Sequence, residues 1–111
     1  MNNDKELLEL AAKAAGIEIE LGHFGPSKSF FIVEDGRLKE QWNPLKDDAQ
    51  ALRLAVKLQI YFMVVPEENQ VNSRIRNGMR SYWLEKLDDD PYAATRRTIV
   101  RAAAAIGRGM E

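Results

Sequence analysis

The chain has 111 residues, of which 45% are hydrophobic and 30% charged, and its formal net charge is −1. This length and balance are typical of one globular domain, so we expect residues 1–111 to form a single α+β domain. The absence of cysteine excludes disulfides, thiolate metal sites and thiol nucleophiles, and no apolar run approaches the roughly 20 residues of a membrane helix.

The first third of the chain is typical of a helix followed by an antiparallel meander. Apolar residues recur at helical spacing between Asp4, a capping residue, and Gly16, a stop signal. Short β-rich segments then predict three strands, at residues 17–21, 30–33 and 37–42. We expect residues 22–29 to form a loop between the first two strands and residues 34–36 to form a turn between the last two.

The middle of the chain holds its two most apolar segments. Asp47 begins a variant of the capping box, which predicts a helix over residues 48–58. Few polar residues interrupt the apolar arc of this helix, so we expect it to be covered on most sides. The uninterrupted run Ile60–Val65 predicts a central strand buried on both faces. This helix and this strand are the expected core.

The C-terminal part predicts a hairpin and a final helix. Asn77-Gly78, a favoured turn dipeptide, separates two segments that we interpret as paired strands, residues 71–76 and 79–84. The run Asp88-Asp89-Asp90 before Pro91 indicates a helix N-terminus, and we expect this helix to end at Ile106 with Gly107 as its stop. Three helices would then pack on a small, mostly antiparallel sheet as a layered α/β/α sandwich, in the order α-β-β-β-α-β-β-β-α.

Three features could carry chemistry, but each has a simpler structural explanation. The Gly22–Ser29 loop ends in Lys-Ser, yet its glycine spacing and Pro26 do not fit a phosphate-binding loop. His23 is the only histidine and lacks partners at metal-ligand spacing. The aspartate run at 88–90 could bind magnesium, although helix capping explains it more economically. We therefore predict no catalytic residue, no cofactor and no metal.

Arginine is the most informative polar residue of the C-terminal half. By helical geometry, three arginines share one side of the last helix, and three more surround the hairpin. Such a cluster could contact an acidic protein or phosphates, or it could be an ordinary solvated surface. The candidate partner-binding residues are Arg74, Arg76, Arg80, Arg97, Arg101 and Arg108. We expect the neighbouring aromatic residues to lie in or at the edge of the core, although they also suit an interface: Trp42, Tyr82 and Trp83.

Two segments resemble known proteins. Residues 42–58, WNPLKDDAQALRLAVKL, and residues 90–107, DPYAATRRTIVRAAAAIG, are similar to segments of small proteins encoded by tailed phages and prophages. In outline they also resemble the phage ABA sandwich domain, in which a helix after a Pro-containing turn precedes a sheet and an Ala-rich helix closes the domain. The resemblance implies a layered fold and a phage origin. It implies no activity, because no catalytic motif accompanies it.

These observations lead to three functional hypotheses. The first is a non-enzymatic phage or prophage accessory protein that binds a host or phage protein, for example to inhibit a host defence or regulatory factor. The alternative is a nucleic-acid-binding accessory protein that uses the arginine-rich face, and the third is a small enzyme whose site no spacing rule reveals. We expect the cytoplasm of the bacterial host as the location and no membrane contact. An exposed edge strand or the hairpin could join two chains in a homodimer.

Overall fold

The computed structural model describes residues 4–24, 27–76 and 81–110. This part of the chain contains the helices α1 (Asp4–Ala15), α2 (Asp48–Leu58) and α3 (Pro91–Gly109). One antiparallel sheet, sheet A, comprises β1 (Ile19–Phe24), β2 (Ser27–Glu34) and β3 (Arg37–Gln41). Another, sheet B, comprises β4 (Ile60–Val65), β5 (Gln70–Ile75) and β6 (Tyr82–Lys86), with a short 3-10 helix, η1 (Pro66–Glu68), after β4.

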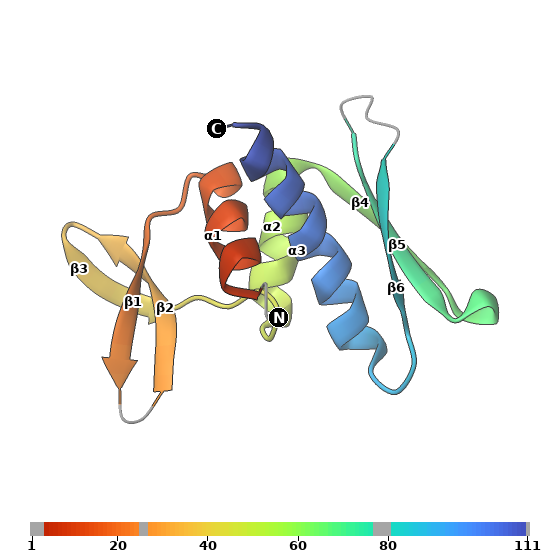
Figure 1. Cartoon of the computed structure of the whole chain (residues 1–111), viewed down its shortest axis with the longest axis horizontal. Helices are drawn as coiled ribbons and strands as arrows, with labels where there is room; N and C mark the ends of the chain where they lie inside the picture. Colours follow the sequence, from red (N-terminus) through yellow and green to blue (C-terminus); the bar gives the residue numbers. More distant parts are fainter. Residues whose placement is uncertain (1–3, 25–26, 77–80, 111) are drawn as a thin grey trace.

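The predicted α+β class and the order of the helices and strands are confirmed. The layering differs from the expected α/β/α sandwich, because the strands form two three-stranded sheets with the helices between them and not one sheet covered by helices (Figure 1). Figure 1 shows the helices in the middle, with sheet A on one side and sheet B on the other. Among the described helices, none is long and apolar enough to cross a membrane.

Sheet A is the predicted meander, with longer strands than the sequence indicated. Asp35 and Gly36 both have positive φ, 54° and 75°, as the two central residues of a type I′ hairpin turn require. The expected loop at residues 22–29 is wrong, because Gly22 pairs with Ser29 and the ladder continues to the end of β1. Gly25 and Pro26, between the two strands, lie outside the described residues.

Helix α2 begins where the capping pattern predicted. The Asp47 carboxylate accepts a hydrogen bond from the Gln50 amide at 3.0 Å, and Gln59 ends the helix with a φ of 56°. The Gln50 side chain is buried, accepts from the Asn43 amide at 2.7 Å and donates to the Gln41 carbonyl at 2.9 Å. Gln50 therefore satisfies backbone groups in the connection from sheet A to α2.

The expectation of a buried central strand at Ile60–Val65 is wrong. Strand β4 lies at one edge of sheet B, which has the order β4-β5-β6. Of its six residues only Ile60 is buried. The apolar arc of α2 is also less covered than expected, because Leu52 and Val56 are 55% and 71% exposed. The two most apolar segments of the sequence are thus partly open to solvent.

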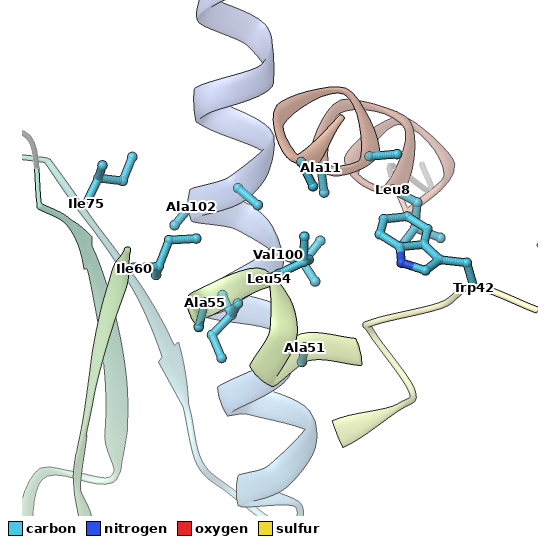
Figure 2. Close-up of a cluster of buried hydrophobic side chains, with 14 of the residues drawn as sticks. Leu8, Ala11, Trp42, Ala51, Leu54, Ala55, Ile60, Ile75, Val100 and Ala102 are labelled. Atoms are coloured by element: carbon cyan, nitrogen blue, oxygen red, sulfur yellow. The ribbon is translucent and has the colours of Figure 1, made fainter. Parts of the chain in front are cut away.

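Helix α3 occupies the centre that the sequence assigned to α2 and β4. It packs against α1, α2 and all three strands of sheet B. Figure 2 shows side chains of the three helices meeting in one cluster with Ile60 and Ile75, while Trp42 lies beside Leu8. The prediction that Trp42 and Trp83 lie in or at the edge of the core is confirmed, with Trp42 in the core and Trp83 packed against it, whereas Tyr82 is 54% exposed.

The start of α3 was predicted correctly, but its end was not. Asp90 accepts a hydrogen bond from the Ala93 amide at 3.0 Å, and Pro91 is the first helical residue. The helix continues to Gly109, so Gly107 is no stop signal. Gly107 is buried within the helix because the backbone of Leu10 in α1 passes directly beside it. A glycine here permits a close approach of two helices.

Candidate functional site

The predicted arginine face is partly used within the fold. Arg101 approaches Glu85 of β6 at 2.7 Å and donates to the Leu84 carbonyl at 3.1 Å. Arg97 approaches the same Glu85 carboxylate at 3.9 Å and pairs with Asp4 of α1 at 3.1 Å. These two arginines therefore tie α3 to β6 and α1, with their charges balanced by neighbouring carboxylates.

The other predicted arginines lie on different parts of the molecule. Arg74 is exposed on β5, with its guanidinium 5.3 Å from the centre of the Tyr82 ring. Arg76 is exposed just after β5, and Arg108 is exposed in the last turn of α3. Arg80 lies outside the described residues. The structure brings Arg97 and Arg101 together at Glu85 and leaves Arg74 on a separate surface.

Replacing Glu85 with glutamine tests the structural role of this ion-paired group. The Glu85 side chain is 25% exposed, and the side chains of Arg97 and Arg101 are 39% and 35% exposed. Because a partly buried charge-assisted contact is lost, we expect Glu85→Gln to reduce the free energy of unfolding by about 1.5 kcal/mol. Urea denaturation measures this. The control is Glu34→Gln, since the Glu34–Lys39 pair is more than half exposed and should contribute less than about 0.5 kcal/mol.

The structure places the remaining chemical candidates in a strand and around the start of α3. His23 belongs to β1, where it pairs with Lys28, and not to a loop. Asp90 caps α3, while the Asp88 carboxylate accepts from the Asn69 side-chain amide at 3.0 Å. Within the described residues, no group of three or more histidine, aspartate or glutamate side chains is arranged to hold a metal ion.

Sheet B leaves the face away from α3 open. Strand alternation directs Val71, Ser73 and Ile75 toward α3, where the Ser73 hydroxyl donates to the Thr98 carbonyl at 2.8 Å. The ladder therefore places the intervening residues of the three strands on the opposite side of the sheet. We call the exposed side chains on that side the outer face: Tyr61, Met63, Arg74, Tyr82 and Leu84.

The outer face combines apolar and aromatic groups with positive charge. Tyr61 and Tyr82 flank Arg74 in the ladder, and Met63 and Leu84 flank Asn72. The next row adds Lys86, opposite Gln70. No carboxylate belongs to these paired positions, although the Gln70 side chain in the last row donates to the Glu68 carboxylate at 2.7 Å. The surface therefore combines apolar side chains with Arg74 at one end and a mixed row of charges at the other. Aromatic residues, methionine and arginine are the types enriched where proteins contact one another.

A second open surface lies on the helical side of β4. A groove of about 320 Å³ lies between α2, β4 and the start of α3, and we call it the α2–β4 groove. Tyr92, at its rim, is 71% exposed. Arg96 is held there by Asp48 at 2.6 Å and by the Leu45 carbonyl at 2.8 Å. The apolar groove-lining residues are Ala51, Leu52, Phe62, Val64, Tyr92 and Ile99.

Of the residues on these two surfaces, only Arg74 and Tyr82 were singled out from the sequence as candidates for an interface. The apolar runs of α2 and β4 were predicted to be buried, because a run of apolar residues carries no information on whether its cover comes from the same chain. Comparison of the chain with protein-family models, with curated proteins and with solved structures gives no match.

Proposed function

We propose that this protein is a non-enzymatic phage or prophage accessory protein that acts by binding a host or phage protein through the outer face of sheet B. The resemblance of residues 42–58 and 90–107 to phage-encoded proteins supports the setting. Inhibition of a host defence or regulatory factor is one form that such binding takes.

The observation that carries the proposal is the composition of the outer face. Tyr61, Met63 and Tyr82 are 58%, 61% and 54% exposed on one side of the same sheet, next to Arg74. Rigid aromatic groups beside arginine are typical of the few residues that contribute most to binding energy. Lys86 shares its row with Gln70, which holds the Glu68 carboxylate, so Arg74 is the charge without a neighbouring carboxylate in the paired rows. The matching partner surface is therefore apolar, with an acidic group opposite Arg74.

A capture experiment with matched double variants tests this function. Immobilised wild-type protein is expected to retain a specific protein from host or infected-cell lysate, and Arg74→Glu with Tyr82→Thr is expected to abolish retention. Both residues are exposed, and threonine at position 82 keeps a strand-favouring residue. The control is Arg37→Glu with Leu38→Thr on β3 of sheet A, where both residues are also exposed. Equal capture by wild type and the Arg74/Tyr82 variant would contradict the proposal.

The nucleic-acid alternative predicts that the immobilised protein retains DNA or RNA in the same capture experiment. Binding to DNA or RNA weakens steeply with salt, because bound counterions are released from the phosphates. Arg76 and Arg108 are the exposed arginines to replace with alanine, since Arg97 and Arg101 already pair with carboxylates. Salt-sensitive nucleic-acid retention that these replacements weaken would support the alternative and count against protein binding as the principal activity.

A further inference from the structure

The free edge of β4 lacks the features by which proteins protect strand edges. Its six residues pair with β5 in one unbroken register, and none is charged or proline. The opposite edge of the sheet is different, because β6 contains Glu85 and Lys86 and its Leu84 carbonyl accepts from Arg101 at 3.1 Å. Exposed edges usually have charges, proline, bulges or a cover, so an apolar, regular edge indicates a pairing surface.

The hydrogen-bonding groups of this edge follow from the ladder. The Arg76 amide donates to the Gln59 carbonyl at 3.3 Å, in register with the antiparallel pairs of β4 and β5. In such a ladder, alternate residues direct both peptide groups toward the same neighbour. The amides and carbonyls of every second residue after Gln59 therefore point toward β5. The residues between them, Ile60, Phe62 and Val64, direct their amides and carbonyls outward.

We propose that a second copy of this chain occupies this edge, so that two β4 strands pair antiparallel about a twofold axis at Phe62. Ile60 then pairs with Val64 of the partner subunit, and Phe62 pairs with the partner's Phe62. This register satisfies every outward amide and carbonyl of the three residues with the same groups of the second copy, as a self-complementary twofold interface requires. The two copies of sheet B become one continuous six-stranded sheet.

The side chains around the edge suit the same arrangement. On the outer face Tyr61 lies beside the partner's Met63, a favourable sulfur–aromatic pair, and both remain accessible from that side. On the helical side, α2 contacts β4, so the second copy brings another α2 into the same layer. Because β4 has no charged residue, pairing places no like charges opposite one another.

Exposed apolar side chains line the edge and the groove beside it. Six of them are between 42% and 71% exposed: Leu52, Tyr61, Phe62, Met63, Val64 and Tyr92. At roughly 150–250 Å² for a large side chain, they offer on the order of 500 Å² per copy, and part of Tyr61 and Met63 stays open. A standard stable interface buries about 800 Å² per partner, so this is a small interface whose specificity comes from the paired backbone groups of the edge. This inference goes beyond the proposed function. It assigns the edge of β4 to a second copy of the chain and leaves the outer face of sheet B accessible to the proposed protein partner.

Sedimentation of the full chain tests the dimer directly. Wild type is expected to sediment as a dimer at micromolar concentration, and Val64→Lys is expected to sediment as a monomer because it places a charge at the edge. The β4–β5 ladder is kept in this variant, since the Val64 peptide groups point away from β5. The matched control is Leu38→Lys on β3, because Leu38 and Val64 are 41% and 43% exposed. It should remain a dimer.

A cysteine cross-link tests the register and does not depend on the lysine variant. The chain has no cysteine, so a single introduced thiol can join only to its own copy. Phe62→Cys is expected to form a covalent dimer on mild oxidation, because residues paired at the axis lie about 5.5 Å apart at Cα. Tyr61→Cys is the neighbouring control. It faces the partner's Met63 and is too far from its own copy to be bridged.

The outcomes separate this inference from the proposed function. A monomeric wild type overturns it, as does a dimer that persists in Val64→Lys and gives no cross-link through Phe62→Cys. A different result would be that the wild type is a monomer and captures a protein, and that Val64→Lys no longer captures it. This result overturns the second copy as occupant and assigns the edge to a strand of the captured protein. A cross-linked dimer that captures no protein supports the inference while contradicting the proposed function.

Discussion

Replacing Gly107 with alanine is expected to reduce the free energy of unfolding by about 3 kcal/mol, enough to leave a marginally stable domain largely unfolded at moderate temperature. A Cβ on Gly107 would overlap the carbonyl oxygen of Leu10 and lie 2.8 Å from its carbonyl carbon. That group is backbone of α1, so it cannot move aside as a flexible side chain would. Relief of the overlap requires α1 and α3 to separate. Thermal and urea unfolding measure the loss.

Gly109→Ala is the matched control on the same helix. A Cβ on Gly109 meets no atom within 4 Å. Because alanine has the higher helix propensity, this variant should be neutral or more stable by up to about 1 kcal/mol. Equal stability of the Gly107 and Gly109 variants would show that the helices do not approach each other as closely as described.

Replacing Trp42 with alanine is expected to cost about 3–5 kcal/mol, the range for removal of a buried aromatic side chain. Trp42 is 3% exposed and lies beside Leu8 of α1 (Figure 2). Its amide also donates to the Phe30 carbonyl of β2 at 2.8 Å. Trp42 therefore joins sheet A to the helices, and its loss should release that sheet first. Hydrogen exchange should show β1–β3 losing protection before α3 and sheet B do.

Two comparisons make the Trp42 result interpretable. Trp42→Phe keeps part of the ring and should cost clearly less than Trp42→Ala. Leu38→Ala, at a 41% exposed position of the same sheet, should change stability by less than about 0.5 kcal/mol. Uniform loss of protection across all elements would contradict the role of Trp42 as the link between sheet A and the helices.

The starts of α2 and α3, the end of α1 and the turn between β2 and β3 were predictable because their signals are local. The last strand was not, since β6 begins at Tyr82 and not at residue 79, and the predicted turn at Asn77-Gly78 lies outside the described residues. Asp47 and Asp90 accept hydrogen bonds from amides three residues ahead, and the positive φ of Gly16 ends α1. The turn at Asp35 and Gly36 follows from the same chemistry. Interactions of this kind depend on a few neighbouring residues, and they act in the same way wherever the segment finally packs.

The candidate surfaces were not predictable because apolar periodicity indicates only that a segment gains from being covered. Leu54 and Val56 are both apolar residues of α2, yet they are 2% and 71% exposed. The apolar sequence of β4 is typical of a central strand, but β4 lies at the edge of its sheet. Glu85 reads as a surface residue, whereas it is the shared partner of Arg97 and Arg101. These outcomes depend on contacts between residues far apart in the chain.

By itself, the sequence determined the α+β class, the order of the elements, the N-terminal caps of α2 and α3, the end of α1 and the turn between β2 and β3. Only the tertiary structure decided which element is central. The small residues of α3, with Gly107 against Leu10, allow α1 to approach α3 closely, so α3 and not α2 occupies the middle of the fold. With that centre taken, packing leaves β4 and part of α2 at the periphery, where the apolar edge of β4 is open to a second copy.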